Sequence, residues 1–149
     1  MLDKDVIRAR LLSDLSMIGL PMNEVDLFIR PYSKTFYGRY YPVYDEDCVK
    51  PRVFVYPYEE NGDLIDYNTI LSCGGIHEMC HHIEYTDPSW VRLKGVAHDV
   101  KFWKLYSYYV MKAHRYGVLG GSFDVEEIIY ETTRTNQRVY NSGVVSAYS

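Results

Sequence analysis

Two histidines and a glutamate stand at metal-site spacing in the run His77-Glu78-Met79-Cys80-His81, an HExxH pattern. In a helix, residues four apart share one face about 6 Å apart along the axis, so both imidazoles can bind a single ion. Glu78 projects beside them and can hydrogen-bond a metal-bound water without being a ligand, as a general base does in metal-assisted hydrolysis. The pattern predicts a zinc site on His77 and His81 with Glu78 as its base.

A zinc site of this kind needs a third protein ligand. The metzincin spacing is absent, because Glu84 and Asp87 occupy the positions where that pattern has Gly and His. His98 is the favoured candidate, since it stands at the predicted start of a helix, where the dipole keeps its ring neutral and able to bind metal. The alternative third ligands are Asp99, His114, Glu126 and Glu127.

Helices and short strands must position these groups. Apolar residues recur at helical spacing in 5–19, and β-branched and aromatic runs predict three strands of one small sheet at 25–29, 35–44 and 53–56. Strand 53–56 is our candidate for an exposed edge to which a substrate peptide could add. The helices expected after the sheet cover 69–84 with Asn68 as N-cap, 99–116, and 125–138 behind a capping box at Asp124.

Three features near the motif have simpler interpretations. His82 points about 140° away from His77 around the helix, so we interpret it as a surface or supporting residue and not a ligand. Cys73 lies about 12 Å along the axis from His81, too far to share an ion, and is interpreted as a core thiol. Gly74 and Gly75 weaken a helix and are expected where a neighbouring element packs closely.

The composition fits one α+β domain over residues 1–149, with its core at about 5–116 and a C-terminal helix and tail at 122–149. The chain has no long apolar run, three cysteines without a CxxC pair, and a formal charge of -4. We therefore expect a cytoplasmic protein without a membrane segment, a disulfide framework or a broad basic surface for nucleic acid. Packing in a small sheet accounts for most of the sixteen tyrosines. A surface for a protein partner is the second interpretation, which leaves room for a place in a larger particle.

The HEMCH run at 77–81 and the run GVAHDVKFW at 95–103 resemble the SprT-like metallopeptidases, whose signature joins HExxH to a later His-Gly-x-x-Phe. The expected order of elements over residues 5–116 is also similar to the core of that family. The resemblance implies a zincin-like fold, a three-stranded sheet packed against the HExxH helix and two or three further helices. It also implies a zinc peptidase with ligands His77, His81 and His98, catalytic Glu78, and Phe102 packed behind the third ligand.

Two departures from the family bear on function. Asp99 replaces the usual glycine after the third histidine, which indicates either a carboxylate that supports the ligand or an altered loop. No cysteine follows Cys80, so the family's zinc ribbon is absent and direct DNA binding is not expected.

We therefore expect a zinc metallopeptidase that cleaves a protein or peptide substrate by means of zinc-bound water and Glu78. A protease acting on one specific partner is a narrower form of this hypothesis. The alternative is a non-catalytic structural or interaction protein of a larger assembly that keeps the fold and the metal.

Overall fold

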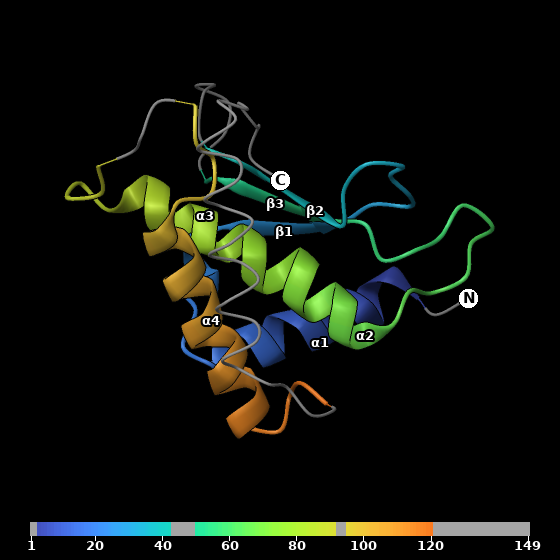
Figure 1. Ribbon diagram of the computed structural model, residues 1–149. Helices are drawn as coiled ribbons and strands as arrows, with labels where there is room; N and C mark the ends of the chain where they lie inside the picture. Colours follow the sequence, from blue (N-terminus) through green and yellow to red (C-terminus); the bar gives the residue numbers. More distant parts are fainter. Residues whose placement is uncertain (1–2, 43–49, 92–94, 121–149) are drawn as a thin grey trace.

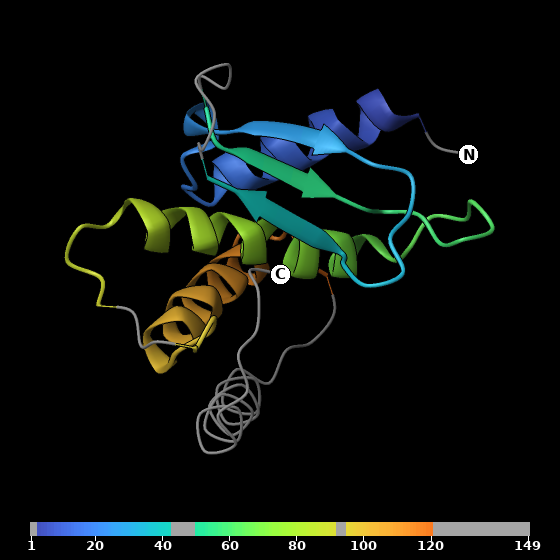
Figure 2. The same cartoon turned by 90° about the horizontal axis from the view of Figure 1, so that it is seen from above.

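The computed structural model describes residues 3–42, 50–91 and 95–120. It is an α+β structure in which a three-stranded sheet lies over a layer of helices (Figures 1 and 2). In chain order the helices are α1 (Lys4–Met17), α2 (Tyr67–Thr69), α3 (His77–Thr86) and α4 (Val100–Arg115). None of the helices in these ranges is both long enough and apolar enough to cross a bilayer.

The sheet is mixed, and its strand order is β1-β3-β2. The strands are β1 (Asp26–Ile29), β2 (Gly38–Tyr41) and β3 (Arg52–Val55). β3 runs parallel to β1 and antiparallel to β2, with Gly38 opposite Val55. The three predicted strands are confirmed, but the expected exposed edge at 53–56 is wrong, because β3 is paired on both sides. β2 is instead the edge strand beside the helix that carries His77 and His81, here called the histidine helix, as Figure 2 shows.

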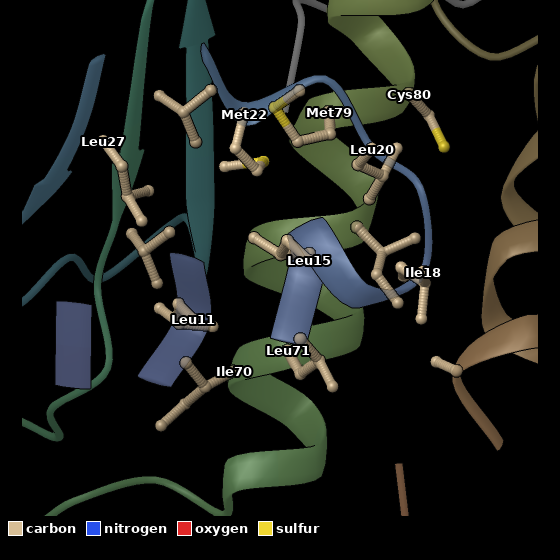
Figure 3. Close-up of a cluster of buried hydrophobic side chains, with 14 of the residues drawn as sticks. Leu11, Leu15, Ile18, Leu20, Met22, Leu27, Ile70, Leu71, Met79 and Cys80 are labelled. Atoms are coloured by element: carbon tan, nitrogen blue, oxygen red, sulfur yellow. The ribbon is translucent and has the colours of Figure 1, made fainter. Parts of the chain in front are cut away.

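One face of the sheet forms the core with α1 and the histidine helix (Figure 3). Val53 and Val55 are fully buried on this face, and Leu11 and Leu15 of α1 are fully buried against it. Burying each such aliphatic side chain contributes about 1.5–3 kcal/mol to folding. The Arg8 Nε also donates to the Leu27 carbonyl oxygen at 2.8 Å, which fixes α1 to β1. The helix predicted at 5–19 is confirmed by α1.

The histidine helix is continuous from α2 through a π-helical stretch (Ile70–Ile76) to α3. Its N-cap is Asp66, whose side chain accepts from the Thr69 N–H at 3.2 Å, so the helix begins before the Asn68 cap expected from the sequence. It ends at Asp87 in an extended conformation, as expected for a residue that precedes proline.

Gly74 and Gly75 allow two elements to approach the π-helical stretch closely. A Cβ on Gly74 would lie 3.0 Å from Val55 Cγ1, and one on Gly75 would lie 3.0 Å from Leu15 Cδ1. The sheet and α1 therefore pack against two adjacent glycines of one helix, and the expected close packing is confirmed. The helix predicted at 99–116 is also confirmed, by α4, whereas the helix predicted at 125–138 and the tail lie outside the described residues.

Candidate metal centre

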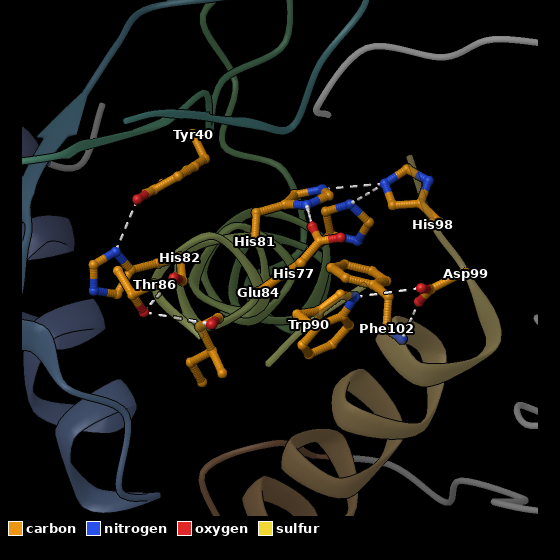
Figure 4. Close-up of polar contacts among 11 residues, drawn as sticks. Tyr40, His77, His81, His82, Glu84, Thr86, Trp90, His98, Asp99 and Phe102 are labelled. Carbon is orange, nitrogen blue, oxygen red and sulfur yellow. Dashed lines mark hydrogen bonds and ion pairs between the residues drawn. The ribbon is translucent and has the colours of Figure 1, made fainter. Parts of the chain in front are cut away.

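Three histidines converge on one point between α3 and the start of α4 (Figure 4). The Nε2 atom of His98 lies 3.2 Å from His77 Nε2 and 3.1 Å from His81 Nε2. His77 and His81 come from successive turns of α3, and His98 precedes the first turn of α4. The structure thus brings together the three residues that the sequence predicts as zinc ligands.

A buried carboxylate fixes the orientation of His81. The Nδ1 atom of His81 lies 3.3 Å from Glu84 Oε1, and both side chains are almost fully buried. An N–H at Nδ1 donates to the carboxylate and leaves the Nε2 lone pair directed at the other two imidazoles. The sequence interpretation missed this role of Glu84, although its position three residues after His81 places both side chains on one helix face.

His98 is positioned by the cap of α4. Asp99 Oδ1 accepts from the Phe102 backbone N–H at 2.7 Å, as an N-cap does. Its other oxygen, Oδ2, accepts from the Trp90 indole N–H at 3.3 Å. Asp99 therefore links the segment after α3 to the first turn of α4 and fixes the backbone next to His98.

Aromatic residues of α4 form the wall behind the histidines. Phe102 is fully buried, and the His81 ring stacks on it with centroids 4.5 Å apart. The His77 ring contacts Trp103 and Tyr106 as well, at centroid distances of 5.8 and 5.7 Å. These rings exclude water and restrict the imidazole rotamers, which strengthens any charge interaction at the centre.

Glu78 is buried without a hydrogen-bond partner. Its side chain has no exposed surface, and neither carboxylate oxygen is hydrogen-bonded within the described residues. Burial raises the pKa of Glu78 to about 8, and the positive charge of Arg39 and the nearby Tyr40 backbone N–H partly oppose this rise. Unsatisfied buried carboxylates are costly and rare, and they concentrate at functional sites.

Glu78 lies against the edge strand. A Cβ on Gly38 of β2 would be 2.8 Å from Glu78 Cγ, so glycine is what lets β2 cross the helix here. Gly38 also lines a cavity of about 230 Å³ together with His77, Cys73 and the loop before β2. The cavity gives access to the imidazole of His77 from the side of the edge strand.

The structure describes Cys73 and Cys80 and two of the four alternative third ligands. Cys73 lines this cavity and is half-buried, so its interpretation as a core thiol is only partly correct. Cys80 is fully buried, which raises the pKa of its thiol well above the usual value. Asp99 is used as a helix cap, and His114 is exposed on the last turn of α4. The other two candidates, Glu126 and Glu127, lie outside the described residues.

His82 is buried, so the surface position is wrong, whereas the other expected role, a supporting residue that is not a ligand, agrees with the structure. Its Nδ1 atom lies 2.9 Å from the Tyr40 hydroxyl, and its Nε2 atom lies 2.8 Å from Glu24 Oε1. Figure 4 shows His82 on the side of α3 opposite the three-histidine cluster. It connects α3 to β2 and to the turn before β1, and it is not part of the cluster.

The donor set fits zinc. Ligands 2.0–2.1 Å from a tetrahedral zinc ion lie about 3.3 Å apart, close to the two Nε2 separations measured at His98. Three neutral imidazoles with a fourth position left open are the ligand set of catalytic zinc sites.

Comparisons of the chain with protein-family models, with curated proteins and with solved structures find no match.

Proposed function

We propose that this protein is a zinc-dependent metallopeptidase with a zincin-like fold. The observation that carries the proposal is the convergence of His77, His81 and His98 within 4.8 Å of one another, next to Glu78, whose buried carboxylate has no hydrogen-bond partner among the described residues. A three-histidine centre leaves room for water and substrate, and a neighbouring carboxylate supplies the base. The substrate class that suits the edge strand next to the centre is a protein or peptide.

The residues of this chain divide the work of hydrolysis. A zinc ion held by the three histidines would supply Lewis acidity, which polarises the scissile carbonyl and lowers the pKa of the attacking water. Glu78 accepts a proton from the attacking water and then donates it to the leaving amine. Glu84 holds His81 in the tautomer that can bind metal, and Asp99 holds the backbone at His98.

Burial shifts the pKa of Glu78 toward the range that suits a general base. Burial raises the pKa of this carboxylate, and a nearby dication would lower that pKa again. A carboxylate whose pKa lies between its ordinary value and about 8 can take up a proton and release it near neutral pH. Glu84, which is also buried but lies near His81 Nδ1, has a structural partner and is not suited to proton transfer.

The deciding experiment measures zinc content and peptide cleavage in three proteins: the wild type, His98→Ala and Glu78→Gln. We expect one zinc per chain in the wild type and in Glu78→Gln, none in His98→Ala, and cleavage by the wild type alone. A wild type that takes up no zinc contradicts the proposal. The wild type could instead take up zinc but cleave none of the peptides tested, with Glu78→Gln behaving as the wild type does. That result would favour the non-catalytic protein of a larger assembly.

A further inference from the structure

A second, larger cavity adjoins the one at His77. It has a volume of about 550 Å³ and lies between the loop that precedes β2 and the turn that follows β3. Residues 35–37 line both cavities, so a single loop separates the larger cavity from the histidines. Nothing in the proposed hydrolytic mechanism uses the larger cavity.

The walls of this cavity, here called the tyrosine cavity, combine aromatic rings and carboxylates. The rings come from Tyr32, Tyr37 and Tyr58, and the carboxylates from Glu59 and Glu60. Tyr32 and Tyr37 are 41% and 49% exposed, so their rings are accessible to a ligand. A cation is attracted to aromatic ring faces and to carboxylates alike, whereas an anion is repelled by both.

The cavity has two walls, of which the first is the loop before β2 and the second is the turn after β3. Both walls are fixed by local hydrogen bonds. The Ser33 hydroxyl accepts from the backbone N–H groups of Thr35 and Phe36 at 3.2 and 3.0 Å, which closes a turn in the first wall. In the second wall the Gly62 N–H donates to the Glu59 carbonyl at 2.9 Å, and Gly62 has a φ of +91° that suits glycine. A cavity with walls that are already ordered loses little entropy when a ligand binds.

The carboxylates are available to a ligand. Within the ranges that the structure describes, neither Glu59 nor Glu60 is paired with a cationic side chain, and both are exposed. One cation, Lys34, also lines the cavity, and Arg39 covers the Phe36 ring with its guanidinium carbon 4.6 Å from the ring centroid. Two carboxylates against Lys34 leave the cavity lining with a net negative charge.

We propose that the tyrosine cavity binds a lysine or arginine side chain of the substrate, and so makes the enzyme select peptides with a basic residue near the scissile bond. This inference rests on the proposed peptidase function. A peptide extended along β2 past Gly38 reaches residues 35–37 within about three residues, because a strand advances about 3.3 Å per residue. The basic residue is therefore expected two to four positions from the bond that is cut.

The test is a binding measurement that does not depend on turnover. The probe is a fluorescein-labelled decapeptide of alanine and glycine in which one lysine is moved from position to position. A matched series carries norleucine, which has a similar length and no charge. Fluorescence anisotropy gives Kd for zinc-loaded full-length Glu78→Gln protein, which is not expected to cleave the peptides.

Matched variants assign the effect to the cavity. At the best position, lysine should bind about 5-fold tighter than norleucine. The double variant Glu59→Gln/Glu60→Gln should abolish that preference, and Lys34→Gln should increase it. Because these residues are exposed and outside the core, circular dichroism should show that the variants remain folded.

The possible results separate this inference from the proposed function. Equal binding of the two peptide series, no binding at millimolar protein, or a lysine preference that survives the double variant would each overturn the inference. A lysine preference that requires Glu59 and Glu60 supports it. If that preference is found while the wild type cleaves nothing, the cavity is a binding site for basic peptides and the peptidase proposal alone fails.

Discussion

His81 and His82 are neighbours in sequence, and both are buried, yet their surroundings differ on the two sides of α3. His81 has a carboxylate at one ring nitrogen and two further imidazoles near the other, whereas His82 has a tyrosine hydroxyl at one nitrogen and a carboxylate at the other. A ring with ordinary hydrogen-bond partners on both nitrogens has a structural role. A ring nitrogen that converges with those of other imidazoles, as His81 Nε2 does with His98 Nε2 at 3.1 Å, lies where a metal ligand is expected.

The largest contrast should come from the same substitution at each histidine. We expect His81→Gln to abolish zinc retention after dialysis and His82→Gln to retain one zinc per chain, because only His81 contributes to the cluster. Elemental analysis of the two purified proteins checks this. If both variants lose zinc while both remain folded, the two sides of α3 are not functionally distinct.

Glu78, which is buried in α3, should make the stability of the metal-free protein depend on pH. Glu78 has a folded-state pKa of about 8, above its unfolded value, so the metal-free protein loses stability as pH rises from about 4.5 to 8 and Glu78 ionises. Glu78→Gln should therefore stabilise the metal-free protein by about 3–5 kcal/mol at pH 8 and by little at pH 4.5. Urea unfolding at both pH values measures this, and an equal effect at both would refute the assignment.

A smaller effect is expected at the carboxylate partners of the two histidines. Glu84→Gln should lower zinc affinity about 10–100-fold, because a neutral amide oxygen is a weaker acceptor for the His81 Nδ1–H than the carboxylate is. Glu24→Gln, which alters the partner of His82, is the matched control and should leave zinc affinity unchanged. Competition with a chromophoric chelator gives both affinities, and a loss of affinity in both variants would mean that Glu84 acts through folding.

The smallest effect is expected for Tyr40→Phe. The change removes the hydroxyl near His82 Nδ1 and should cost about 1 kcal/mol of unfolding free energy, with zinc affinity unaffected. Chemical denaturation and the same chelator assay test the two parts separately. A weaker zinc affinity would show that the His82 side of α3 is coupled to the metal centre.

The sequence predicted those parts of the site that depend on local spacing. His77 and His81 share a face because a helix repeats every 3.6 residues, and the start of α4 placed His98 at a helix end. The approach of these three residues is confirmed, and their binding of zinc stays a prediction. Helix 5–19 and the three strands follow from apolar periodicity in the same way.

The parts that the sequence did not reveal depend on tertiary contacts. The central place of β3 arises from its parallel pairing with β1, which no local pattern specifies. The burial of His82 depends on Tyr40 and Glu24, which are far from it in sequence. Asp66 and Asn68 are both good N-cap residues, so composition could not decide between them, and the geometry of the helix start favoured Asp66.

The π-helical stretch at 70–76 has a consequence for how this chain can tolerate changes in length. A π-bulge holds one residue more than an α-helix of the same span, with the flanking turns still in phase. Loss of one residue within 70–73 can thus be absorbed by a return to ordinary α-helical bonding, with Gly74, Gly75 and the HExxH face kept in place. Loss of a residue within 77–81 would rotate the histidines apart. The spacing between the sheet and the motif can therefore change by one residue, whereas the spacing within the motif cannot.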